Sequence, residues 1–210
     1  MASTLPPEYF SRLDESDDSL FYAAPRKVVH LDDGAIAALR DLYGEVLPPG
    51  GHYLDLMSSW RSHLPPSLAP AGVVGLGLNA EEMADNPQLS EAIIHDLNRF
   101  PELPFESDQF DAVLCAVSVQ YLVQPIAVFR EVRRVLKTAG VFIVTFSNRC
   151  FEAKAVAIWR HTTDEQHISL VTHYFAESGP WTDIEARHKP AVAQQFYISD
   201  PLYALWAHKQ

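Results

Sequence analysis

Cysteine is scarce in this chain of 210 residues. Only Cys115 and Cys150 are present, and neither belongs to a CxxC pair. Two cysteines cannot build a disulfide framework, so we expect a reducing, cytoplasmic location. The first ten residues carry no basic cluster and no apolar stretch, which argues against a secretory leader. No uninterrupted apolar run reaches about 18 residues, so no membrane-spanning helix is expected.

Basic residues are few relative to acidic ones. The chain has 16 Lys and Arg against 27 Asp and Glu, which gives a formal net charge of −11. Contacts to phosphate groups need Lys and Arg, so neither nucleic acid nor an anionic membrane is expected as a partner. A small anion bound in a local basic pocket is still compatible with this charge. The partner that we expect is a small-molecule substrate.

Two common catalytic patterns are also missing. The nine histidines are scattered, with no HxxxH or Cys/His spacing that would hold a metal. No GxSxG turn is present to carry a nucleophilic serine. Ser59 and His63 lie four residues apart, but no third member of a triad can be named. We therefore expect neither a metal site nor a Ser-His-Asp hydrolase.

What the chain does contain is an alternation of apolar, strand-like segments with helix-like segments. Strands are predicted at 52–56, 72–78, 92–95, 110–117 and 141–146, with an antiparallel edge pair at 181–188 and 202–209. Helices are predicted after an N-cap at Asp32 or Asp33, over 125–140 with Gly140 as its stop, over 150–161, and from a cap at Asp164 to Gly179. Residues 1–20 are polar and are expected to form a surface arm.

This alternation predicts an α/β sheet whose two faces are covered by helices. Ligands of such sheets bind at the carboxyl ends of the strands, where the strand order reverses. The stretch that follows the strand at 52–56 reads MSSWRSHLP, with no glycine among its residues. Glycine is the residue that lets a backbone approach a ligand closely, so this loop is unusual for a cofactor site.

The order of segments from residue 50 to 208 resembles class I S-adenosylmethionine-dependent methyltransferases of the small-molecule, type 11-like branch. The best match is IIHDLNRFPELPFESDQFDAVLCAVSVQYLVQPIAVFREVRRVLKTAGVFIVTF, with KTAG where such enzymes usually carry KPGG. LDLMSSWRSHLP and FSNRCFEAKAVAIW further resemble a plant and bacterial subgroup with an SSWxSHxP loop. The resemblance implies a three-layer sandwich around a seven-stranded, mostly parallel sheet. It also implies a methyltransferase-like domain over 31–210, preceded by an arm or lid at 1–30.

The resemblance implies S-adenosylmethionine as the cofactor and S-adenosylhomocysteine as the product. Asp96 matches the acidic residue that contacts the adenine amine. Met57, Ser59 and Arg61 stand where the family has three glycines, and Gly77 stands where it has a ribose-binding acid. The residues expected to bind the cofactor are Asp55, Met57, Ser58, Ser59, Trp60, Arg61, Gly77, Leu78, Asn79, Asp96, Leu97, Val117 and Gln120.

Three explanations of the altered loop are open. The loop takes another path, the ligand sits further out, or the site is blocked. Arg61 can pair with the methionine carboxylate and Trp60 can stack on a flat ring or on the sulfonium. Asn79 can accept from one ribose hydroxyl. Catalytic candidates are Tyr121, His63 and His30, which could orient or deprotonate the acceptor.

Each of these residues also has a purely structural interpretation. Trp60 can pack in the core or in a lid, Arg61 can pair with Asp55 or Glu81, and Asp96 can cap a turn. His63 can be a satisfied loop histidine, Asn148 and Arg149 can form a turn, and Cys150 can be a small buried residue. Tyr22, Arg26 and His30 either form a lid or simply pack.

The function expected from the sequence is methylation of a small molecule. The alternative is a non-catalytic protein that keeps the fold for binding or regulation. A third possibility is a pocket for another nucleotide or a small anion, with Arg61 and Arg149 as charge partners.

Overall fold

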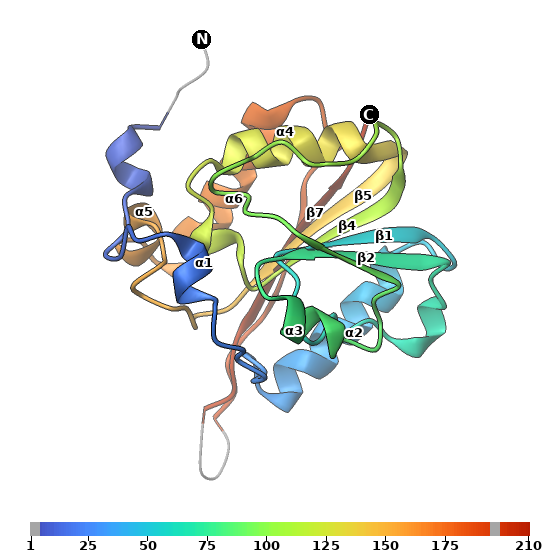
Figure 1. Ribbon diagram of the computed structural model, residues 1–210, viewed down its shortest axis with the longest axis horizontal. Helices are drawn as coiled ribbons and strands as arrows, with labels where there is room; N and C mark the ends of the chain where they lie inside the picture. Colours follow the sequence, from blue (N-terminus) through green and yellow to red (C-terminus); the bar gives the residue numbers. More distant parts are fainter. Residues whose placement is uncertain (1–4, 194–197) are drawn as a thin grey trace.

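A mixed β-sheet is the centre of the computed structural model, which describes residues 5–193 and 198–210 (Figure 1). Within these residues seven strands follow the order β3-β2-β1-β4-β5-β7-β6. Their bounds are β1 His52–Leu56, β2 Gly72–Gly77, β3 Glu91–Ile94, β4 Phe110–Ala116, β5 Leu136–Phe146, β6 Glu185–Lys189 and β7 Leu202–His208. The first five strands are parallel, whereas β7 runs antiparallel to both β5 and β6. The predicted antiparallel pair is confirmed.

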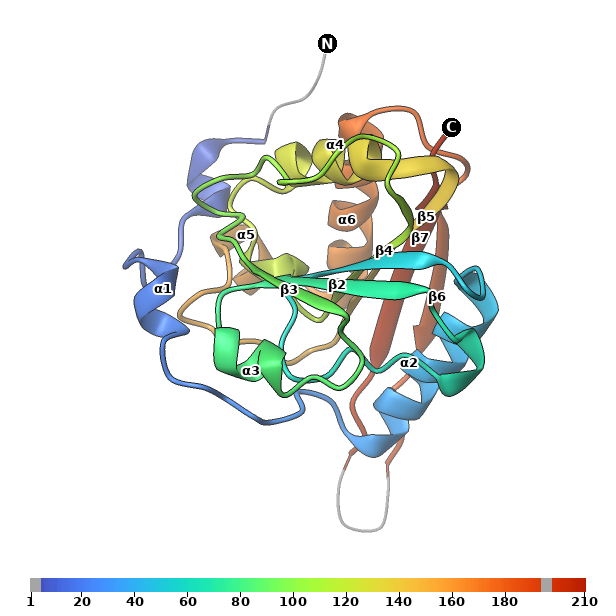
Figure 2. The ribbon, with the colours of Figure 1, turned by 45° about the vertical axis from the view of Figure 1, so that its right-hand side comes forward.

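Helices cover both faces of the sheet (Figure 2). The α-helices are α1 Asp18–Phe21, α2 Asp33–Val46, α3 Ala80–Ala84, α4 Pro125–Val135, α5 Ala157–Arg160 and α6 Asp164–Ser178, and the 3-10 helices are η1 Pro7–Phe10, η2 Pro66–Leu68 and η3 Val119–Tyr121. Helices α2 and α3 lie on one side, and α4 and α6 lie on the other. The predicted three-layer sandwich is therefore confirmed.

Two apolar clusters hold these layers together. On one face, Ile36 and Leu39 of α2 pack against a cluster that includes Ile143 and Trp206 of the sheet. On the other face, the ring of Phe129 in α4 meets the ring of Phe142 in β5 edge to face at 4.8 Å. Burying one such side chain contributes about 1.5–3 kcal/mol. The apolar residues that recur at helical spacing in α2 and α4 thus pack against the two faces of the sheet.

Two helices depart from the sequence prediction at their ends. The helix predicted over 125–140 stops at Val135, because Leu136 already pairs with Phe110 as the first residue of β5. Gly140 lies inside that strand and is not a helix stop. Helix α6 has Thr163 as its N-cap, with a capping box to Gln166, whereas Asp164 was expected to cap it.

The helix predicted over 150–161 is wrong over most of its length. Only Ala157–Arg160 is α-helical. Lys154 is completely buried, and its ammonium lies 3.1 Å from carboxylate oxygens of both Asp14 and Asp18. The ion pairs of Lys154 therefore favour a non-helical backbone before Ala157, although the composition of this segment favours a helix.

The N-terminal segment is also more firmly held than an exposed arm. Residues 1–4 of the expected arm lie outside the described residues. Asp18 is 4% exposed and accepts two hydrogen bonds of 2.8 Å from Nη1 of Arg12. The acidic run that looked like a solvated tail in sequence is an anchor, because one of its carboxylates neutralises buried cations.

Helices of the described residues are all too short or too polar to cross a bilayer. The carboxyl ends of the parallel strands gather at one edge of the sheet, where the strand order changes direction between β1 and β4. This is the edge at which the sequence predicts a ligand site.

Candidate functional site

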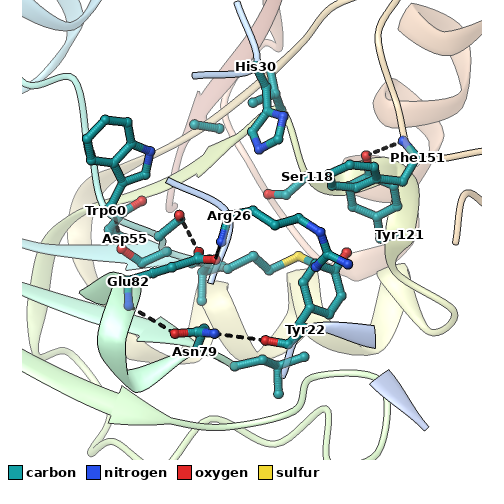
Figure 3. A pocket seen from close by; sticks show the side chains of 18 of the residues that line it. Tyr22, Arg26, His30, Asp55, Trp60, Asn79, Glu82, Ser118, Tyr121 and Phe151 are labelled. Carbon is teal, nitrogen blue, oxygen red and sulfur yellow. Dashed lines mark hydrogen bonds between the residues drawn. The ribbon is translucent and has the colours of Figure 1, made fainter. Parts of the chain in front are cut away.

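A cavity of about 270 Å³ opens at this edge of the sheet (Figure 3). Its wall comes from the segments after β1 to β5 and from residues 22–31 of the N-terminal segment. The predicted residues found in this wall are Asp55, Met57, Ser58, Ser59, Trp60, Arg61, Gly77, Leu78, Asn79, Asp96, Leu97 and Val117, together with Tyr121, His63 and His30. The structure therefore brings together residues that are more than 90 positions apart in the sequence.

Gln120 does not line this cavity, although the sequence suggested that it would. Its side chain is 1% exposed, and its Nε2 donates a 2.9 Å hydrogen bond to the carbonyl of Val117. Val117 has a φ of 44°, which is a costly conformation for a β-branched residue. Gln120 thus helps to hold the strained backbone of Val117 at the end of β4, and Val117 itself forms part of the wall.

The loop after β1 is built around a buried carboxylate. Oδ2 of Asp55 accepts hydrogen bonds of 2.7 Å from the hydroxyls of both Ser58 and Ser62. Met57 takes a φ of 54°, in the left-handed region usually left to glycine. The N–H of Ser58 then donates to the carbonyl of Leu76 at 2.9 Å, which ties the loop to β2. The loop keeps a left-handed turn without using glycine.

Gly77, at the end of β2, has no room for a side chain. A Cβ at this position would collide with the main-chain carbonyl oxygen of Ser58. Any residue with a side chain at position 77 is therefore incompatible with the path of the loop at residues 57–63, the serine loop. The main chain of this loop therefore occupies the space beside Gly77.

Burial of Asp55 changes its protonation. The carboxyl group is 3% exposed, and this burial raises its pKa to about 6, although the two serine hydroxyls oppose the shift. Asp55 therefore serves the loop as a hydrogen-bond acceptor inside the protein.

Glu82 is a site residue that the sequence analysis did not identify. Its Oε2 accepts from the hydroxyl of Ser59 at 2.6 Å, and its Oε1 accepts from the main-chain N–H of Arg26 at 2.5 Å. Asn79 is the N-cap of α3, and its Oδ1 accepts from the N–H of Glu82 at 2.9 Å. The spacing Asn79-x-x-Glu82 is a helix-start pattern, so it was a usable signal for a carboxylate at this strand end.

Residues 22–31 run across the opening of the cavity and are tied to its wall. Nδ2 of Asn79 donates to the carbonyl of Tyr22 at 2.9 Å, and Nε1 of Trp60 donates to the carbonyl of Val28 at 2.9 Å. The ammonium of Lys27 forms exposed ion pairs on the same side. Both ends of the Asn79 amide are therefore engaged within the protein, and its Oδ1 keeps capacity for one further hydrogen bond.

Arg61 has different partners from those expected. Its guanidinium lies 3.9 Å from the centre of the Trp60 ring. Its Nη1 donates to the carbonyls of Trp60 at 2.6 Å and Asp85 at 3.1 Å. The expected pairing with Asp55 or Glu81 is therefore wrong. The stacked pair forms the outer rim of the loop.

Asp96 caps a turn and still presents a carboxylate oxygen. Its Oδ1 accepts from the main-chain N–H groups of Asn98 at 2.9 Å and Arg99 at 3.3 Å. Within the described residues no hydrogen bond reaches its Oδ2. The structural and the ligand-binding interpretations of Asp96 are thus compatible with one another.

Aromatic rings gather on the side of the cavity that lies across from Trp60 and Glu82 (Figure 3). The rings of Tyr121 and Phe151 stack with 6.0 Å between centres, and the ring of His30 meets Phe151 edge to face at 5.3 Å. The hydroxyl of Tyr121 accepts a 2.8 Å hydrogen bond from the N–H of Phe151. This side is formed by η3, by the segment after β5 and by the N-terminal segment.

None of the three catalytic candidates is tuned as a strong base at neutral pH. Burial raises the pKa of Tyr121 to about 12, so its hydroxyl stays protonated. Burial lowers the pKa of His63 to about 4, and it also lowers the pKa of His30. A neutral imidazole with a low pKa accepts a proton only weakly.

The segment after β5 adds one more cation and a thiol. Nε of Arg149 lies 2.6 Å from Oδ1 of Asp200, so this rim arginine already has a carboxylate partner. Cys150 is half-buried, and burial raises the pKa of its thiol, which keeps it in the unreactive protonated form.

Comparisons with known proteins agree with this architecture. Residues 66–144 match the family described as a methyltransferase domain. Among curated proteins none matches the chain. A SAM-dependent methyltransferase from Thermotoga maritima has a TM-score of 0.61 at 12% identity, covering 84% of this chain and 90% of its own. A SAM-dependent methyltransferase from Archaeoglobus fulgidus has a TM-score of 0.60 at 10% identity, covering 83% and 92%.

A third similar structure has a different printed activity. The [4+2]-cyclase SpnF has a TM-score of 0.57 at 18% identity, covering 91% of this chain and 90% of its own. At these identities the likeness establishes a shared fold, the Rossmann-like methyltransferase fold. Because proteins with this fold include a cyclase, activity has to be argued from the site.

Proposed function

We propose that this protein binds S-adenosylmethionine in the cavity and transfers its methyl group to a small molecule. The observation that carries the proposal is the carboxylate of Asp96 at the end of β3, with Oδ2 left without a hydrogen bond among the described residues. The match of residues 66–144 to a methyltransferase domain supports it. The cytoplasmic location and the lid role of residues 1–30 are parts of the same proposal.

The residues of the wall fit an adenosine-containing ligand in part. Asp96 would accept from the adenine amine, and Leu97 and Leu78 would provide apolar contacts beside it. The ribose has no carboxylate at position 77. Glu82 is a buried carboxylate in the same wall, and it already accepts hydrogen bonds from Ser59 and from the main chain of Arg26. The atypical loop is thus expected to hold the cofactor with fewer charged contacts than usual.

When bound, S-adenosylmethionine would supply an electrophilic methyl group, which the acceptor's nucleophilic atom takes while the electron pair of the broken carbon–sulfur bond stays on sulfur. A proton carried by that nucleophilic atom would be released to bulk solvent as the product leaves, because His63 and Tyr121 are poor bases at neutral pH. The protein's contribution would be orientation of the acceptor and exclusion of water. Residues 22–31 are placed to provide that exclusion.

The test is titration calorimetry with S-adenosylmethionine and S-adenosylhomocysteine, after removal of any ligand that co-purifies. The decisive variant is Asp96→Asn, because asparagine keeps the Oδ1 acceptor that caps the turn and replaces Oδ2 by a donor. We expect the Kd of S-adenosylhomocysteine to rise at least about tenfold, since one hydrogen bond to a charged acceptor is lost. The matched control is Asp183→Asn at an exposed position.

Two results would contradict the proposal. One is no binding of either compound by the unmodified protein up to millimolar concentration. The other is binding that Asp96→Asn leaves as tight as Asp183→Asn does.

One observation favours a second candidate, a non-catalytic protein with the same fold. Asn79 and Glu82, the polar groups nearest to the missing ribose acid, are both occupied by residues 22–31. Binding of adenosine-containing ligands without methyl transfer to any acceptor would favour this candidate. Stabilisation by simple phosphates alone would instead favour a site for a small anion.

A further inference from the structure

Arg26 extends across the cavity from the side of Glu82 toward the aromatic side (Figure 3). Its main-chain N–H is fixed to Glu82, and its side chain is half-buried. The Nη1 atom is buried and has no hydrogen-bond partner among the described residues. A buried guanidinium nitrogen without an acceptor costs free energy, so its position needs a reason.

The carboxylates around the cavity do not supply that acceptor. Asp18 is engaged by Arg12, Lys154 and Asn98. Glu82 accepts from Ser59 and from the main chain of Arg26 itself. Asp55 accepts from its two serines inside the loop. Among the described residues no carboxylate forms an ion pair with the Arg26 side chain. Of the two other wall arginines, Arg149 pairs with Asp200, and Arg61 donates to the main-chain carbonyls of Trp60 and Asp85.

Aromatic rings surround the guanidinium on the same side. The central carbon of the Arg26 guanidinium lies 4.4 Å from the ring centre of Phe21, 5.8 Å from that of Tyr22 and 5.6 Å from that of Phe151. The Phe151 ring in turn stacks on Tyr121. The guanidinium therefore lies among aromatic rings, and its buried Nη1 is a donor that remains available to a ligand.

These contacts define a ligand class. A guanidinium edge matches a carboxylate, which can accept two parallel N–H bonds in the plane of the fork. Aromatic walls favour a flat ring, because stacked or edge-to-face rings gain beyond simple burial. A strongly hydrated ion such as phosphate would lose its water against these apolar walls, which makes it a poorer match than an aromatic acid.

We propose that the methyl acceptor is a planar aromatic carboxylic acid, whose carboxylate pairs with Arg26 and whose ring packs among Tyr22, Tyr121 and Phe151. This inference rests on the proposed function for the acceptor role, whereas the acid site itself depends only on the cavity. Arg26 is then the residue that determines specificity for the anion.

The test uses three probes of similar size in titration calorimetry, with and without S-adenosylhomocysteine. They are 4-hydroxybenzoate, its uncharged amide 4-hydroxybenzamide, and cyclohexanecarboxylate, an acid without an aromatic ring. The unmodified protein should bind 4-hydroxybenzoate at least about tenfold more tightly than either comparator. Equal binding of the benzoate and the benzamide, or no binding of the benzoate at millimolar concentration, would overturn the proposal.

Variants then assign the effect to Arg26. In Arg26→Gln the preference for benzoate over benzamide should vanish, and Arg26→Lys, which keeps the charge without the fork, should retain part of it. The matched control is Arg187→Gln, because Arg187 also lies over an aromatic ring, that of Trp206, but is exposed on β6 away from the cavity. It should keep the full preference.

Binding of S-adenosylhomocysteine separates this inference from the function that it refines. If Arg26→Gln weakens that binding about tenfold or more, Arg26 serves the cofactor's own carboxylate and the acceptor proposal falls. If S-adenosylhomocysteine binds normally but no aromatic acid does, the cofactor site stands and the acid site falls. If only the aromatic acid binds, the acid site stands and its role as a methyl acceptor falls.

Discussion

Replacing Asp55 by asparagine should change the pH dependence of stability in a way that reports directly on the serine loop. The carboxyl group is buried, and its Oδ2 accepts from Ser58 and Ser62 at 2.7 Å. Asparagine retains an oxygen that can accept from both hydroxyls and cannot ionise near neutral pH. The substitution therefore keeps the loop's acceptor while it removes the buried charge.

The direction of the effect follows from the raised pKa. Folding raises the pKa of Asp55 from its ordinary value of 3.8 to about 6. Between these values the folded protein holds the proton that the unfolded chain has released, so the free energy of unfolding falls as the pH rises toward 6 and is level above it. Between pH 3.8 and about pH 6 this titration lowers the free energy of unfolding by an amount on the order of 3 kcal/mol.

The assay is urea unfolding of the unmodified protein and of Asp55→Asn at several pH values between about 4.5 and 7.5, with surface variant Asp183→Asn as the control. The free energy of unfolding of Asp55→Asn, relative to the unmodified protein, should rise by about 2 kcal/mol across this range. A pH-independent loss of stability caused by the amide does not affect this change with pH. The titration of His63 also cancels, because it occurs in both proteins. Parallel profiles for the two proteins, or a relative stability that falls with rising pH, would refute the reasoning.

Two further substitutions test other parts of the structure by urea unfolding. Gly77→Ala should lower the free energy of unfolding by about 1–3 kcal/mol, because the new Cβ meets the carbonyl of Ser58. The control Gly44→Ala, on helix α2, makes only an ordinary contact and should be neutral or stabilising by about 1 kcal/mol. Equal effects of the two substitutions would show that Ser58 does not restrict the space at Gly77. Lys154→Ala should cost about 3–5 kcal/mol, because it removes a completely buried cation from its ion pair with the buried carboxylate of Asp18. Lys27→Ala, at exposed pairs, should leave the midpoint unchanged, and a loss as large as that of Lys154→Ala would contradict the anchoring role.

The site was predictable where a residue's position follows from the end of a strand. Asp55 lies in β1 one residue before its end, Gly77 ends β2, and Asp96 follows β3. Parallel strands bring their carboxyl ends together whatever the loops do. Gln120 does not line the cavity, for the complementary reason. It lies in η3 after a strand, and a 3-10 turn of three residues can direct a side chain inward or outward with the same sequence spacing.

Glu82 and Arg26 show a second limit. Their contact joins positions 56 residues apart, through one main-chain N–H and one carboxylate oxygen. Every residue except proline has a main-chain N–H, so the type of the donating residue does not indicate such a bond. The sequence therefore offers no pattern from which to predict it. The meeting of Lys154 with Asp14 and Asp18 is similar, because each residue alone reads as part of a solvated surface.

By itself the sequence determined the layered α/β fold, because apolar strands and amphipathic helices can bury their surfaces in few ways once they alternate along a chain. It also determined which strand ends carry polar chemistry. Only the tertiary structure decided that the serine loop crosses β2 over Gly77, that Asp55 lies inside that loop, and that the guanidinium of Arg26 lies among aromatic rings. Those outcomes depend on close approach between segments distant in sequence, where burial and steric exclusion act on atoms that no local pattern brings together.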